Sequence, residues 1–215
     1  MSACGSSSPG SRQQGYELSY RLAREQFEGI GDLQEQCRRS GAQYASANRI
    51  TLDYLNQPYH ISLPEIEITL EGSQAEVSLK DRILILHYFT LAKGTPPSGK
   101  LVTYRQLPGG TSYFAAFSQR AIRPLVRRFG SDPESLISTA AKLGGLRADH
   151  GEVSVTINVF PHVSVTLVLW RGDDEVEANG NVLFDASASD YLCTEDLAVV
   201  TETIVWKLVK DTSSR

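Results

Sequence analysis

Four histidines are the side chains of this chain best suited to acid–base chemistry near neutral pH: His60, His87, His150 and His162. Neither His-x-x-x-His nor His-Glu-x-x-His occurs, so the sequence predicts no metal site. His87 differs from the others because it lies inside the apolar run "LILHYF". We expect a partly buried, hydrogen-bonded imidazole there; the alternative is one axial ligand to a metal macrocycle.

Cys193 is the candidate for thiol chemistry. It directly precedes Thr194, which can cap the final predicted helix, and a helix N-terminus lowers a thiol pKa. The alternative is a small structural residue. The other cysteines, Cys4 and Cys37, are far away, and no Cys-x-x-Cys occurs. Because Gly-x-Ser-x-Gly and the phosphate-binding glycine motifs are also absent, no catalytic residue is predicted.

Aromatic and guanidinium side chains supply the main binding hypothesis. Such groups hold flat or anionic ligands by stacking and by forked hydrogen bonds. We therefore predict a ligand-binding groove lined by Tyr104, Arg105, Trp170, Arg171 and Tyr191. Core packing is the alternative role for Trp170, and the cofactor or ligand stays unknown.

Two charged segments could also make contacts. The acidic run in "TLVLWRGDDEVEANGNVLFD" does not match a calcium loop, so it predicts an exposed hairpin turn, with a weak cation or partner contact as the alternative. The arginines of "SQRAIRPLVRRFG" (Arg120, Arg123, Arg127 and Arg128) predict a solvated helix face, with a local anion-binding patch as the alternative.

The overall composition excludes several classes of protein. The 215 residues carry a net charge of −4, so we expect no dedicated nucleic-acid binder. We expect no membrane span, because no apolar run approaches the length that a bilayer requires. The opening residues lack the apolar core of a signal peptide, and cysteines are few. These features predict a cytoplasmic protein.

The hydrophobic periodicity predicts the elements that must position these residues. Helical spacing favours helices over residues 16–28, 32–39, 79–93, 114–129 and 133–143, and from 194 onwards. Alternation favours strands over residues 50–54, 59–63, 66–70, 100–107, 153–159, 163–169 and 181–185. We predict an α+β fold, a single compact domain over residues 16–210 in which antiparallel hairpins pack with about five helices. Residues 1–15 and 211–215 are predicted to be disordered tails.

Several longer motifs resemble a known family. These are "YRLAREQ", "YLNQPYHISLP", "ILHYFTLAKGTPPSGKLVTYRQLPGG", "FSQRAIRPL" and "VFPHVSVTLVLWRGDDEVEANGNVLFDASASDYLCTEDLAVV". Over about residues 16–210 the chain is similar to the prokaryotic family called domain of unknown function 3786. The resemblance implies a cytoplasmic protein of anaerobes. Because some members are fused to a cysteine-rich segment, it also implies an iron–sulfur or corrinoid-dependent partner protein.

Two positions depart from that family pattern. Only Cys4 lies near the N-terminus, so the four-cysteine cluster is absent, and Cys193 stands where a "YLPTED"-like run has proline. The leading hypothesis is a non-catalytic accessory that binds a cofactor or partner in anaerobic redox or one-carbon metabolism. The alternative is an enzyme whose acids and histidine meet only in three dimensions, for instance His87 with Asp185 or Asp190.

Overall fold

The computed structural model of the protein describes residues 9–45 and 48–211. Its first helix, α1 (Pro9–Glu28), begins earlier than the predicted boundary at residue 16. Proline suits the first turn of a helix, where its missing N–H costs nothing, and this explains the earlier start. Disordered tails were predicted over residues 1–15 and 211–215, but residues 9–15 and residue 211 are helical. The rest of both predicted tails, residues 1–8 and 212–215, lies outside the described residues.

Most of the remaining elements follow the predicted order of helices and hairpins. The strand predicted over residues 100–107 is shorter, because it ends at Thr103 and a 3₁₀ turn, Tyr104–Gln106, follows. Two short strands, Gln43–Ala45 and Leu146–Ala148, were not predicted. The other α-helices are α2 (Leu33–Ser40), α3 (Leu79–Leu91), α4 (Gly110–Phe117), α5 (Arg123–Phe129), α6 (Glu134–Ala140) and α7 (Thr194–Asp211). The strands are β1 (Gln43–Ala45), β2 (Arg49–Tyr54), β3 (Gln57–Ser62), β4 (Glu67–Leu70), β5 (Leu101–Thr103), β6 (Leu146–Ala148), β7 (Val153–Phe160), β8 (Val163–Trp170) and β9 (Asn179–Asp185). A π-helical segment, Ser118–Ile122, joins α4 to α5, so the predicted helix over 114–129 changes its winding in the middle.

The first sheet is an antiparallel meander in the order β1-β2-β3-β4. Ile50 pairs with Ile61 and Leu52 with Tyr59, and all four side chains are buried on the same face. The β2–β3 turn has positive φ at Leu55 and Asn56, which matches the right-handed twist of a two-residue hairpin. The alternation in the sequence therefore gives this sheet one core face.

The second sheet has the antiparallel order β5-β9-β8-β7-β6. Its central strands, β7 and β8, pair from Val153 with Leu169 to Phe160 with Val163. Thr156 and Thr166 face each other across this pair, and their hydroxyl oxygens lie 2.8 Å apart. This is the hairpin that the alternating valines predict.

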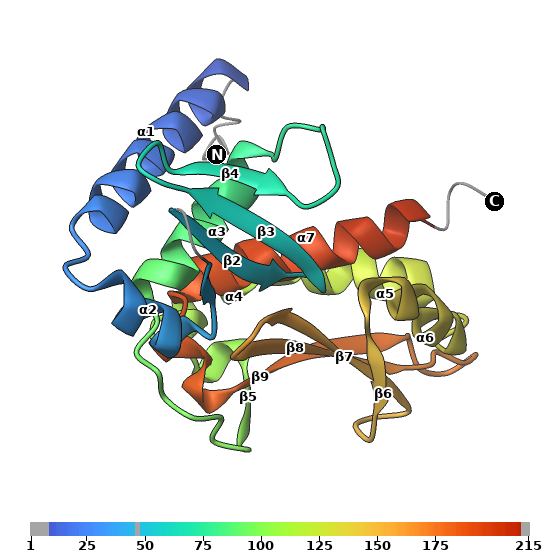
Figure 1. Ribbon diagram of the computed structural model, residues 1–215. Helices are drawn as coiled ribbons and strands as arrows, with labels where there is room; N and C mark the ends of the chain where they lie inside the picture. The colour runs from blue at the N-terminus through green and yellow to red at the C-terminus, as the bar shows by residue number, and fades with distance from the viewer. Residues whose placement is uncertain (1–8, 46–47, 212–215) are drawn as a thin grey trace.

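Helices α3 and α7 bring the two sheets into one core. Figure 1 shows α7 running between the two sheets, while α1 lies along the outside of α3. The sheets also meet directly, because the backbone N–H of Leu55 donates to the carbonyl of Val159 at 2.8 Å. The chain is thus a single α+β domain. Within the described residues, no helix is both long and apolar enough to cross a membrane.

Alanine substitutions at two glycines test the contact between the end of α2, at Gly41, and the β7–β8 turn, at Pro161. Gly41 and Gly72 have nearly equal φ values of 72° and 71°, but only at Gly41 would an added Cβ meet a neighbour, Pro161 Cβ, at 2.7 Å. We expect Gly72→Ala to lower the free energy of unfolding by about 1 kcal/mol through backbone strain alone. Gly41→Ala should cost about 2–4 kcal/mol, because overpacking adds to that strain. Urea denaturation measures both, and equal losses would contradict the predicted packing.

Candidate functional site

One face of α3 carries polar side chains into a pocket. Ser78 caps this helix, since its hydroxyl accepts from the backbone N–H of Asp81 at 3.2 Å. Lys80, Leu84 and His87 follow at helical spacing, so they lie on the same side of α3. The neighbouring side chains Ile85 and Leu86 are fully buried in the core. The sequence run "LILHYF" therefore fixes His87 on a rigid, buried helix.

The start of α7 supplies the partners of His87. The helix begins at Thr194, and its cap is Cys193 rather than the predicted Thr194. The Cys193 sulfur accepts from the backbone N–H of Asp196 at 3.4 Å, and its thiol donates to Asp196 Oδ2 at 3.1 Å. The Thr194 hydroxyl instead donates to the carbonyl of Pro108 at 2.7 Å. This reciprocal cap holds the Asp196 carboxylate in place.

His87 and Asp196 form a hydrogen-bonded pair. The imidazole Nδ1 lies 2.9 Å from Oδ2 and 3.1 Å from Oδ1 of Asp196. Because an ionised carboxylate can only accept, Nδ1 is the donor of this bond, and in the neutral imidazole Nε2 keeps its lone pair. Among the residues that the structure describes, Nε2 makes no hydrogen bond, and the His87 side chain is 24% exposed. The pair can thus present an oriented base to a ligand.

The pair lines a pocket of about 330 Å³ between α1, α3, the π-helical segment and the start of α7. Its wall is completed by other side chains from these elements: Tyr16, Ser19, Lys80, Ile83, Leu84, Arg120, Cys193, Glu195 and Val199. Lys80 and Arg120 share Glu202, whose Oε2 lies 3.8 Å from Lys80 Nζ and 3.0 Å from Arg120 Nε. Burial lowers the pKa of Lys80, and Glu202 partly opposes that shift.

Cys193 is a neutral thiol in this pocket, contrary to the lowered pKa expected at a helix start. Cys193 as a whole is exposed, but desolvation of its sulfur, followed by the negative charge of Asp196, raises the thiol pKa to about 11. We expect iodoacetamide to alkylate Cys193 at least about a hundredfold more slowly at pH 8 than a model cysteine peptide. Asp196→Asn should speed the reaction. Peptide mapping by mass spectrometry follows Cys193 separately, and alkylation at the rate of the model peptide would contradict this prediction.

The acids suggested as partners of His87 lie elsewhere. Asp185 accepts hydrogen bonds from Ser98, Gly99 and Ser187 at 2.6–3.0 Å, so it organises the turn after β9. Burial alone would raise its pKa, but these hydrogen bonds outweigh burial and hold the pKa well below its usual value. Asp190 accepts from Lys93 at 2.7 Å and from Thr95 at 2.9 Å. The pairing of His87 with Asp185 or Asp190 was therefore wrong, and Asp196 takes that place.

The residues of the predicted groove are divided between the core and two surfaces. Tyr104 is buried after β5, stacks on Phe117 with ring centroids 3.9 Å apart, and donates to the carbonyl of Thr194 at 3.3 Å. Arg105 next to it is exposed and places its guanidinium 3.7 Å from the Phe114 ring centre. These two residues lie at one end of the second sheet, close to α4.

Trp170, Arg171 and Tyr191 lie apart from that pair. Trp170 ends β8 opposite Asn179, and Arg171 beside it hydrogen-bonds Glu152 at 2.8 and 3.3 Å. Tyr191 is fully buried against Tyr88. The five residues therefore do not line one groove in the structure. Tyr104 lies beside Arg105, Trp170 lies beside Arg171 at a separate place, and Tyr191 is in the core. Their ligand-binding role stays a prediction.

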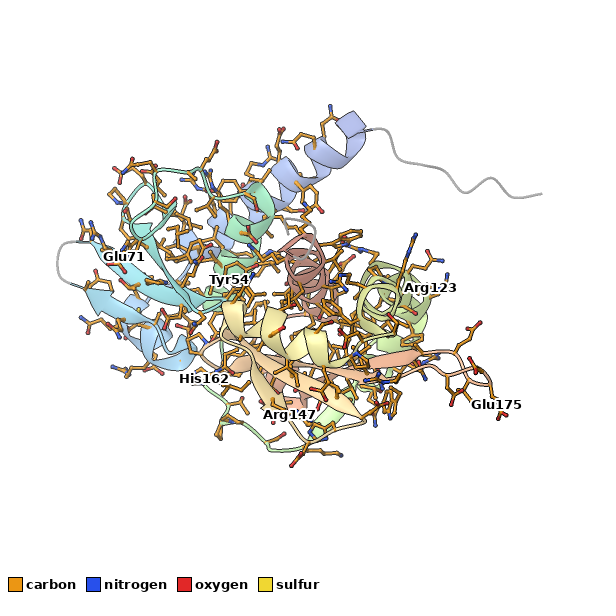
Figure 2. The ribbon with its side chains drawn as sticks, turned by 90° about the vertical axis from the view of Figure 1, so that its right-hand side faces the viewer. Tyr54, Glu71, Arg123, Arg147, His162 and Glu175 are labelled. Atoms are coloured by element: carbon orange, nitrogen blue, oxygen red, sulfur yellow. The ribbon has the colours of Figure 1, made fainter. Side chains whose placement is uncertain are left out.

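The acidic hairpin forms an ordered turn at the surface. Asp173 accepts from the backbone N–H groups of Glu175 and Val176 at 2.9 and 2.7 Å, and these bonds lower its pKa. Figure 2 shows Glu175 at the tip of this loop, projecting away from the body of the protein. In the part of the chain that the structure describes, no group of three His, Cys, Asp or Glu side chains could hold a metal ion.

Comparison with known proteins identifies a family but no activity. The family described as "Domain of unknown function (DUF3786)" matches residues 32–207. No curated protein and no solved structure matches the chain. The match covers most of the chain, including both partners of the His87–Asp196 pair. The protein therefore belongs to the DUF3786 family.

Proposed function

We propose that the protein binds a small polar molecule in the pocket of His87 and transfers a proton to or from it. The observation that carries the proposal is the bond between His87 Nδ1 and Asp196 Oδ2, 2.9 Å long, inside a pocket of about 330 Å³. A carboxylate that fixes the tautomer of an imidazole leaves Nε2 as an oriented general base. The pocket volume lies at the lower end of the range for small-molecule sites, about 300–1,000 Å³.

The charges around the pocket favour a zwitterionic or dipolar ligand. Lys80 and Arg120 are cationic, whereas Glu195 and Asp196 are anionic, and all four line the same cavity. The cations can stabilise negative charge that develops when a proton leaves a carbon next to a carbonyl or carboxyl group. Because the Cys193 pKa is raised to about 11, covalent attack by that thiol is disfavoured at neutral pH. Proton transfer at carbon is the reaction that these groups support best.

The experiment is a binding screen followed by hydrogen exchange. Small zwitterions and keto acids are screened against the wild-type protein by ligand-observed NMR. Each compound that binds is then incubated with the protein in D2O, and loss of its C–H signal is followed. We expect at least one compound to exchange a C–H next to its carbonyl or carboxyl group faster with protein than without it. Absence of exchange in every bound compound contradicts proton transfer at carbon.

A non-catalytic accessory that binds a cofactor or partner in anaerobic redox or one-carbon metabolism is the second candidate function. The observation that favours it is the neutral Cys193 thiol, which is bonded to Asp196 rather than poised for attack. The same screen separates the two functions. Binding that disappears in a variant blocked at the pocket, Ser19→Trp, but that brings no exchange supports the accessory function. A cytoplasmic location and an iron–sulfur or corrinoid-dependent partner belong to this proposal.

A further inference from the structure

A second hollow, separate from the His87 pocket, lies between α5 and the C-terminal half of α7. It has a volume of about 540 Å³ and is lined by Gln119, Arg123, Pro124, Arg127, Arg128, Trp206 and Val209, which we call the Trp206 groove. Trp206 is 44% exposed, although large aromatic side chains usually lie in the core. Trp206 and Val209 are one helical turn apart, so together they form an apolar wall.

Positive charge faces this apolar wall. Arg123 and Arg127 are four residues apart on α5, so two like charges lie on one helix face, an arrangement that costs a few tenths of a kcal/mol. Both side chains are exposed, and neither forms an ion pair with any residue that the structure describes. Figure 2 shows Arg123 at the periphery of the molecule. The protein as a whole carries a net charge of −4, so this cluster is opposite in sign to the overall charge.

Two more cationic side chains lie on the other side of Trp206 and extend the region of positive charge. Lys207 and Lys210 line an adjoining hollow of about 190 Å³ that shares Trp206 with the groove. One acidic residue, Asp81, also lines that adjoining hollow. Its carboxylate already accepts hydrogen bonds from the Tyr54 hydroxyl at 2.8 Å and from the Ser78 hydroxyl at 2.7 Å. Among the described residues that line the Trp206 groove, none is acidic. An anion in the groove would therefore meet cations, without a competing carboxylate from the described part of its wall.

We propose that the Trp206 groove binds a small anion that carries a planar aromatic group, such as a nucleotide or an aromatic carboxylate. The indole of Trp206 offers a face for stacking, and the guanidinium groups of Arg123 and Arg127 offer forked donors for phosphate or carboxylate oxygens. The volume of the groove lies well inside the range of small-molecule sites. The exposure of Arg123 and Arg127 agrees with the predicted solvated helix face, and the proposal builds on the stated alternative, a local anion-binding patch.

The shape of the site favours a small molecule over an acidic protein segment. Pro124, Trp206 and Val209 form a concave apolar surface, which a flat ring can cover but a purely charged chain cannot use. Stacking needs one aromatic plane, and a single exposed indole supplies it. The ligand should therefore need both its ring and its charge, and this double requirement is the basis of the test.

The test compares ligands that contain one or both features. ADP and 2-naphthoate carry a ring and a charge, adenosine carries only the ring, and pyrophosphate only the charge. We expect ADP, 2-naphthoate or both to quench tryptophan emission of the full-length protein. The ligand that binds more tightly shows whether the groove prefers a phosphate or a carboxylate as the anionic group. Adenosine and pyrophosphate should bind at least about tenfold more weakly. Binding of pyrophosphate or polyglutamate as tight as that of the best aromatic anion would overturn the proposal, and so would no binding of either aromatic anion.

Variants locate the binding. Quenching should survive Trp170→Phe and be lost in Trp206→Phe, because only the second change removes the proposed reporter. Arg127→Gln should weaken binding about tenfold by calorimetry, since it removes one charged hydrogen-bonding group. The control is Arg147→Gln: Arg147 is exposed on β6 and lies 3.5 Å from Glu134, outside the groove. All four changes are at exposed positions, so circular dichroism should show an unchanged fold. Equal weakening in the Arg127 and Arg147 variants contradicts the proposed site.

Discussion

His87→Gln is expected to slow the exchange of a bound ligand's C–H about 10²–10⁴-fold, the usual contribution of a general base. Glutamine can still donate a hydrogen bond to Asp196, whose Oδ2 lies 2.9 Å from His87 Nδ1 in the wild type. It cannot, however, accept a proton as the free Nε2 does. Binding affinity should change much less than rate, because the pocket keeps its other side chains. The measurement is the exchange rate in D2O by NMR with a ligand found in the screen.

The matched control for this change is His150→Gln. His150 is exposed in the loop before β7, and its backbone rather than its imidazole bonds Ser154. This variant should exchange the ligand at the wild-type rate. If His87→Gln also keeps the wild-type rate while the ligand still binds, His87 is not the base, and the accessory function becomes the better account.

Tyr88→Ala is expected to lower the free energy of unfolding by about 4–6 kcal/mol, the largest stability effect we predict. Its ring is fully buried and stacks on Phe160, with centroids 4.1 Å apart and planes 5° apart. Its hydroxyl donates to the carbonyl of Ser40 at 2.7 Å and accepts from the backbone N–H of His162 at 3.2 Å. Removing it opens a cavity and leaves both backbone groups without that partner. Urea denaturation measures the loss.

Two further variants keep this prediction testable if the alanine variant does not fold. Tyr88→Phe keeps the ring and removes only the hydroxyl, so it should cost about 1–3 kcal/mol. Tyr113→Ala removes a tyrosine that is 57% exposed on α4 and should cost about 0.5 kcal/mol or less. A Tyr88→Phe variant as stable as the wild type would show that the hydroxyl does not join α2, α3 and the β7–β8 turn.

The local elements were predictable where one physical signal dominates. Alternating valines in β7 and β8 place one face of each strand in the core, and the structure pairs them as predicted. Ser78 as a cap and the apolar run that follows it defined α3, including the partly buried, hydrogen-bonded state of His87. In each case the signal lies within a few residues of the element that it defines.

The partner of His87 was not predictable by the same means. Asp196 lies 109 residues away along the chain, and an acid in the first turn of a helix is ordinary for its interaction with the helix dipole. Only the packing of α3 against the start of α7 brings the two groups together. A reciprocal cap between positions 193 and 196 could have been suspected from their spacing, but it would not have indicated His87.

One feature of the Trp206 groove, the exposure of its tryptophan, could be predicted from the sequence. Leu197, Val200, Ile204 and Leu208 form the buried stripe of α7, and helical periodicity places Trp206 off that stripe. An exposed tryptophan was therefore deducible. Its position opposite Arg123 and Arg127 was not, because it depends on how α5 packs against α7.

The most direct test of the His87–Asp196 pair is long-range proton–nitrogen NMR of the imidazole at mildly alkaline pH. The account predicts a His87 ring protonated at Nδ1 with a bare Nε2, and Nε2 resonances that shift when a pocket ligand is added. It also predicts that Asp196→Asn abolishes this tautomer preference. A His87 ring protonated mainly at Nε2, or one that no pocket ligand perturbs, would contradict the account.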